Sequence, residues 1–198
     1  MNAYLAGLAA SFSLIVAIGA QNAFVLKQGL MRRHVLATCA FCALSDAVLI
    51  SAGVLGAGAL AARAPWFLAV MRWGGAAFLL VYGGRALRAA WRGGESLRAG
   101  SGAAGLGATL AVLAALTWLN PHVWLDTVVL LGSVSARWEN KAGFLAGAVS
   151  ASLLFFFALG YGARWLAPLF ARPLAWRVLD ASVGLVMWSI ALSLVLHG

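Results

Sequence analysis

The sequence predicts an all-α integral membrane protein with six transmembrane helices, arranged as two inverted repeats of three helices. Three observations support this prediction. Of the 198 residues, 64% are hydrophobic and only 10% are charged, whereas a soluble domain is about half apolar and a quarter charged. The apolar residues form six runs, each near the roughly 20 residues that a helix needs to cross the hydrocarbon core. The two halves of the chain also share short motifs in the same order.

The apolar runs and the polar breaks between them define the expected spans. They lie at residues 3–26, 35–60, 66–86, 104–132, 142–163 and 175–196. We therefore expect a single transmembrane domain over residues 1–198, with repeat one at about 3–90 and repeat two at about 103–196. The connector 88–102 is the longest, and it is polar and rich in glycine. If one marginal run fails to cross, the number of spans is five.

The first span is expected to be retained, because residues 1–26 hold no Lys or Arg and so lack the charged start of a signal peptide. Basic residues in the connectors orient the bundle. Ten lie on the side of the connectors that follow spans one, three and five, and four lie on the other side. The positive-inside rule then places both termini outside the cytoplasm. The net charge of +9 is explained in this way, and nucleic acid is excluded as a partner.

The internal repeat rests on four matches between the halves. They are AQNAF (20–24) with LNPHV (119–123), GAGAL (56–60) with GYGAR (160–164), APWF (64–67) with APLF (167–170), and Arg72 with Arg177. Because three spans is an odd number, the second copy must cross the membrane upside down. Inverted repeats are typical of secondary transporters, whose substrate site lies near the midplane between the repeats.

Two acidic residues lie well inside predicted spans, Asp46 in the second and Asp126 in the fourth. Intramembrane carboxylates are costly and usually face an interior path. Without a deeply placed base beside them, they favour a cation or the binding and release of protons. A third acid, Asp180, follows Arg177 by three residues, and we expect these two to form an ion pair.

Asn120 and Pro121 predict a break in the fourth span. Proline disrupts the helix before it but fits the first position of a new helix, and asparagine is a favoured N-cap. The positive dipole end of the new helix would then face the membrane interior, where a carboxylate could bind. His122 and Asp126, spaced i,i+4, would share one face. A plain proline kink is the alternative.

The matching place in the first repeat holds Gly19, Gln21 and Asn22, a glycine and two amides. Two further motifs are interpreted structurally. GFLAG (143–147) is a GxxxG pattern typical of helix packing, within or between protomers. The CxxC pair of Cys39 and Cys42 lies in an apolar run, so we expect buried small side chains.

Several stretches resemble the LysE family of bacterial amino-acid exporters, in its lysine/arginine branch. They are GAQNAFVLKQGLMRRH, CALSDAVLI, LTWLNPHVWLDTVVLLG and FFFALGYGARWLAPLF, and the resemblance runs from about residue 19 to 195. It implies an inner-membrane exporter of basic amino acids, driven by the membrane potential or a proton gradient. It also implies functional positions at Gln21, Asn22, Asp46, Asn120, Pro121 and Asp126.

The expected function is secondary active export of arginine and/or lysine by alternating access. The cationic group would pair with Asp46 and Asp126, and the carboxylate would meet the helix start at Pro121 and the amides of Gln21, Asn22 and Asn120. His122 completes the predicted site. We expect no enzyme activity, no cofactor and no metal site; the partners are the amino acid, protons, the lipid bilayer and a second copy in a homodimer.

Three alternatives differ in class. An exporter of metal or other small cations would use Asp46, Asp126 and His122, joined by Cys39 and Cys42, but softer metals need a denser cluster of His and Cys. An intramembrane hydrolase built on His122 and Asp126 lacks any catalytic signature. A purely structural subunit leaves the two inner acids unexplained.

Overall fold

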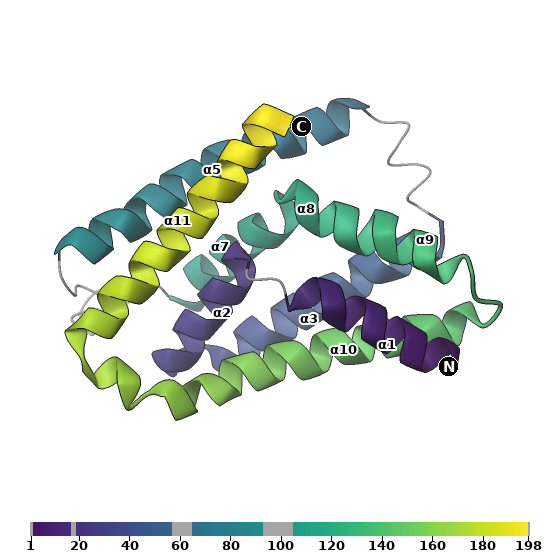
Figure 1. The fold of residues 1–198 in the computed structure, drawn as a ribbon, viewed down its shortest axis with the longest axis horizontal. Coiled ribbons are helices and arrows are strands. Elements are labelled where there is room, and N and C mark those ends of the chain that lie inside the picture. Colours follow the sequence, from purple (N-terminus) through teal and green to yellow (C-terminus); the bar gives the residue numbers. More distant parts are fainter. Residues whose placement is uncertain (1, 17–18, 57–64, 93–104, 198) are drawn as a thin grey trace.

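The computed structural model describes residues 2–16, 19–56, 65–92 and 105–197, and within these ranges every regular element is helical (Figure 1). In chain order the elements are α1 (Ala3–Ile15), α2 (Ala20–Leu30), α3 (Val35–Val54), α5 (Pro65–Arg92), α7 (Leu106–Trp118), α8 (Pro121–Trp124), the π-helix η1 (Leu125–Leu130), α9 (Leu131–Ser135), α10 (Lys141–Gly162), the 3₁₀ turns η2 (Ala163–Leu166) and η3 (Leu169–Ala171), and α11 (Pro173–His197). The end of the predicted second span, 57–60, and most of the predicted long connector, 93–102, lie outside the described residues.

Helices occupy all six predicted spans, but the first and fourth are broken. α1 and α2 meet at 84°, and α7 meets the helical run Pro121–Ser135 at 62°. Among the described residues, three helices are individually long and apolar enough to cross a membrane, and each bent pair taken as one span raises the number to as many as five. The helix of the third predicted span, α5, is not among them and carries four arginines. Six crossings therefore stay a prediction.

The two breaks differ in how far the sequence anticipates them. The break before Pro121 confirms the half-helix prediction. The break in the first span was not predicted, since 3–26 reads as one apolar run. It occurs because Gly19 is extended at the start of α2 (φ −112°, ψ 170°), and the Asn22 side-chain amide donates to the carbonyl of Ile15 at the end of α1 (2.7 Å). This amide bonds a backbone carbonyl that the end of a helix otherwise leaves without a partner.

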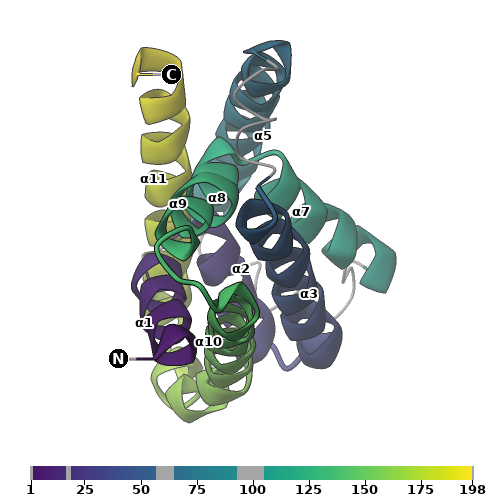
Figure 2. The ribbon, with the colours of Figure 1, turned by 90° about the vertical axis from the view of Figure 1, so that its right-hand side faces the viewer.

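Three helix pairs organise the bundle (Figures 1 and 2). α5 packs lengthwise against α11, α1 against α10, and α10 against α3. In the α1–α10 pair, the backbone of Phe144 lies directly over Gly7 and that of Tyr4 directly over Gly147, so any Cβ at either glycine would collide. Gly147 thus packs helices within one chain, as small residues do in membranes, and the GxxxG prediction is confirmed for that residue.

The cysteines are buried, as predicted, and form no disulfide; Cys39 Sγ donates to the carbonyl of Phe156 in α10 at 3.2 Å. The predicted ion pair between Arg177 and Asp180 is wrong. Asp180 instead forms an ion pair with Lys27 of α2, with 2.6 Å between Nζ and Oδ1. Arg177 Nε donates to the carbonyl of Ala90 in α5 at 3.0 Å. These partners replace the local pair because α11 contacts both α5 and α2. Asp180 therefore meets Lys27, and Arg177 meets the carbonyl of Ala90, instead of each other.

Candidate functional site

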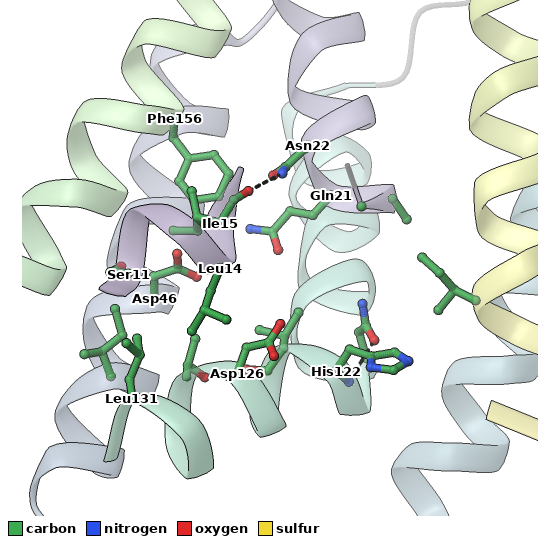
Figure 3. A pocket seen from close by; sticks show the side chains of 17 residues that line it. Ser11, Leu14, Ile15, Gln21, Asn22, Asp46, His122, Asp126, Leu131 and Phe156 are labelled. Carbon is green, nitrogen blue, oxygen red and sulfur yellow. Dashed lines mark hydrogen bonds between the residues drawn. The ribbon is translucent and has the colours of Figure 1, made fainter. Parts of the chain in front are cut away.

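A pocket of about 320 Å³ lies where the two broken helices meet the centre of α3 (Figure 3). Ligand pockets typically hold roughly 300–1,000 Å³, so one small molecule fits. Six of the seven predicted site residues line this pocket. They are Gln21, Asn22, Asp46, Asn120, His122 and Asp126. Three helices far apart in sequence therefore bring the predicted residues together; the seventh, Pro121, is buried but does not line the pocket.

The two carboxylates reach the pocket from different elements. Asp46 projects from the middle of α3 with only 3% of its surface exposed, and Ser152 Oγ of α10 donates to its Oδ2 at 2.8 Å. Asp126 lies on η1, one residue after the π-helix begins. In Figure 3 Asp126 lies between Asp46 and His122. Among the described residues no lysine or arginine lines the pocket, so its formal charge is negative wherever an aspartate is ionised.

The first break supplies amides and one hydroxyl. Gln21 and Asn22 begin α2 beside the extended Gly19, and the Gln21 side chain reaches into the pocket (Figure 3). The Nε2 atom of Gln21 and the Oγ atom of Ser11 are both buried, and neither makes a hydrogen bond of good geometry within the described part of the chain, although the Gln21 side chain lies beside the Cys42 thiol. Buried polar groups are nearly always satisfied, so these two atoms are suited to bind an occupant of the pocket.

The fourth break is held by its own side chains. Asn120 caps the new helix by accepting from the backbone N–H of His122 (3.1 Å), and Pro121 takes the first helical position. The Trp124 indole donates to the carbonyl of Trp118 (3.0 Å), the last residue of α7. These hydrogen bonds stabilise the break, and His122 and Asp126, which follow it, line the pocket.

Three polar residues escaped the sequence analysis. Ser11 and Thr127 line the pocket, and Ser152 contacts Asp46 from behind it. Ser11 lies four residues after Gly7, so a stripe of small residues on α1 could have indicated its inward face. No comparable signal exists for Thr127 or Ser152, because isolated hydroxyls in apolar helices usually bond to their own backbone.

Within the described ranges, no three His, Cys, Asp or Glu side chains gather closely enough to hold a metal ion. The polar lining of the pocket consists of two carboxylates, the amides of Gln21, Asn22 and Asn120, and hydroxyls; the Ser11 side chain lies beside Asp46, apart from Gln21 and Asn22 (Figure 3).

Apolar helices broken around a central polar pocket are the architecture of membrane transporters, which place substrate at discontinuous helices. The chain belongs to the LysE type translocator family, which matches residues 12–198. It is 48% identical to the arginine exporter protein ArgO of Yersinia enterocolitica, over 98% of this chain and 97% of that protein. Proteins of the same name from Salmonella schwarzengrund and Salmonella paratyphi B are 46% and 45% identical, each over 98% of this chain and 94% of theirs. No solved structure matches the chain.

Proposed function

We propose that this protein exports basic L-amino acids, arginine and/or lysine, from the cytoplasm by alternating access. The observation that carries the proposal is the pocket itself, because two aspartates line it without a lysine or arginine among its described lining residues. The relatives named arginine exporters agree with a cationic amino acid as substrate. A zwitterion with an extra positive charge needs more carboxylates than basic groups in its site, and this pocket provides them.

The proposed binding mode uses both broken helices. The cationic side chain or amino group of the substrate pairs with Asp46 and Asp126. The substrate carboxylate accepts hydrogen bonds at the amides of Gln21 and Asn120 and near the helix start at Pro121. Gln21 Nε2 is favoured for this role because it makes no hydrogen bond of good geometry among the described atoms. The Asn22 amide already donates to Ile15 and supports the break, and His122 lines the pocket beyond Asp126 as seen from Asp46 (Figure 3).

The inverted repeat is part of the proposal, and two features of the fold support it. The first helix of each predicted repeat is the broken one. The last helices pair reciprocally: Arg72 near the start of α5 donates to the carbonyls of Leu194 (2.7 Å) and Val195 (2.8 Å) near the end of α11, while Arg177 near the start of α11 donates to Ala90 near the end of α5. A two-fold relation between the halves explains this exchange, and rocking of one half against the other would alternate access.

We further propose a place in the bacterial inner membrane with both termini outside the cytoplasm. Proton coupling follows if an aspartate exchanges a proton for substrate, and export down the membrane potential alone is the other mode. A homodimer is compatible with the apolar outer surface of the bundle.

Export is tested by adding labelled arginine or lysine to the outside of inverted membrane vesicles, with and without a proton gradient, because the cytoplasmic face of such vesicles is outermost. We expect uptake that exceeds that of vesicles lacking the protein. Asp46→Asn and Asp126→Asn should each reduce it at least about tenfold, because truncating one side of a buried charge pair costs about 2–5 kcal/mol. The matched control is Glu139→Gln, an exposed acid outside the pocket. Normal uptake by Asp46→Asn with full membrane insertion would exclude this binding mode.

A further inference from the structure

Most serines of the membrane helices that donate a hydrogen bond donate it to a carbonyl of their own helical run. Ser51, Ser133, Ser150 and Ser182 each donate their hydroxyl proton to the carbonyl four residues earlier on their own helix. Ser152 does not. Its hydroxyl leaves α10 and donates to the Oδ2 atom of Asp46 on α3, at 2.8 Å.

This departure is unusual because bonding to the own backbone is the local option for a helical serine, and Ser150 takes it only two residues away. Ser152 has no exposed surface and does not line the pocket, so it cannot touch an occupant. Within the described part of the chain, Ser152 is connected to the pocket by its hydrogen bond to Asp46.

We propose that Ser152 is a positioning residue that holds the Asp46 carboxylate in the orientation that binds the substrate. The terminal torsion of an aspartate is broad, so an unheld carboxylate would rotate. With Oδ2 engaged by the hydroxyl, the plane of the carboxylate is set and Oδ1 keeps its lone pairs for a group in the pocket. Ser152 lies in the second half of the chain and Asp46 in the first, so the bond spans the interface between the predicted repeats.

The inference rests on the proposed function for its consequence. A guanidinium is a planar fork of donors that binds a carboxylate of matching orientation. If the carboxylate turns freely, the substrate must order it at each binding event, and the affinity falls. The maximal rate changes less, because Ser152 touches neither the substrate nor the connectors.

Labelled-arginine uptake by inverted vesicles, measured over a range of concentrations, tests the role. Ser152→Ala should raise the apparent KM by about 3- to 10-fold, since ordering a freed side chain on binding costs about 0.5–1.5 kcal/mol. The apparent kcat should change by less than about threefold on the same scale. Ser150→Ala, on the same helix, is the matched control and should keep the wild-type KM.

Two more variants separate the hydrogen bond from packing. Ser152→Cys keeps nearly the same size but has only a weak donor, so it should resemble Ser152→Ala. Ser152→Thr keeps the hydroxyl and should retain most of the affinity. Wild-type KM in Ser152→Cys, or a loss of kcat without a change of KM in Ser152→Ala, would overturn the positioning role.

A second measurement does not depend on the substrate. A hydrophobic carbodiimide reacts with carboxyl groups in apolar surroundings: the carboxyl proton passes to a carbodiimide nitrogen and the carboxyl oxygen adds to the central carbon. Mass spectrometry then gives the rate of modification at Asp46. Because the Ser152 hydroxyl occupies Oδ2 of Asp46, its removal frees that oxygen to react, so Ser152→Ala should be modified several-fold faster than wild type, and Ser150→Ala at the wild-type rate. Equal rates in all three proteins would refute the contact. Absence of arginine uptake by the wild type, with the rate difference intact, would instead refute the proposed function.

Discussion

The ion pair between Lys27 and Asp180 is unevenly buried, and this asymmetry predicts unequal effects of removing either partner. The Asp180 side chain is 3% exposed and that of Lys27 is 24% exposed. Lys27→Met leaves a buried carboxylate without its partner, which costs about 3 kcal/mol or more. Asp180→Asn frees a lysine that can extend toward the membrane surface, so its cost is smaller. Thermal unfolding of the purified protein in detergent measures the difference.

Two controls accompany this comparison. Lys141→Met removes an exposed lysine at the start of α10 and should leave the unfolding temperature unchanged. The double variant Lys27→Met/Asp180→Leu removes both charges and should recover most of the stability that Lys27→Met loses, because apolar pairs often replace buried ion pairs at no cost. Equal unfolding temperatures for the two single variants would show that burial does not control this pair.

At the scale of elements, the fourth break could be predicted because its causes are local. Asn120 and Pro121 are adjacent, and capping and the missing proline N–H act within one turn. The first break has no proline, and it depends on Asn22 reaching back seven residues to Ile15. Partners on other helices, such as Ser152 for Asp46 or Lys27 for Asp180, were beyond prediction, because the rotation and depth of each helix decide them and a single sequence specifies neither.

The fourth break also rests on a neighbouring helix. The carbonyl of Leu119 lies directly against Gly75 of α5, where any Cβ would collide with it. Gly75→Ala should therefore displace the break, lower stability by about 1–3 kcal/mol as overpacking does, and reduce arginine uptake by vesicles. Gly74→Ala is the matched control, since nothing lies within 4 Å of the Cβ it would add. If both variants transport arginine equally, the close contact between Leu119 and Gly75 of α5 is not required for the site.

At the scale of the whole molecule, the distribution of basic residues predicts the orientation of the bundle. Arg172, between η3 and α11, lies on the side that carries ten Lys and Arg, and Glu139, before α10, on the side that carries four. Because α10 connects the two sides and is apolar enough to cross a membrane, these two exposed positions should lie on opposite faces. The positive-inside rule places Arg172 in the cytoplasm.

Cysteine labelling in spheroplasts tests this orientation. Glu139→Cys should react with a membrane-impermeant maleimide in intact spheroplasts, and Arg172→Cys only after the membrane is opened. The native Cys39 and Cys42 have no exposed surface, so the unmodified chain should stay unlabelled and serves as background. The reverse pattern would show that the bundle has the opposite orientation, with both termini in the cytoplasm, and would contradict the proposed topology. Labelling of both positions from one side would mean that α10 does not cross the membrane. Because Ser152 of α10 contacts Asp46 at the pocket, that result would also contradict a pocket near the membrane centre.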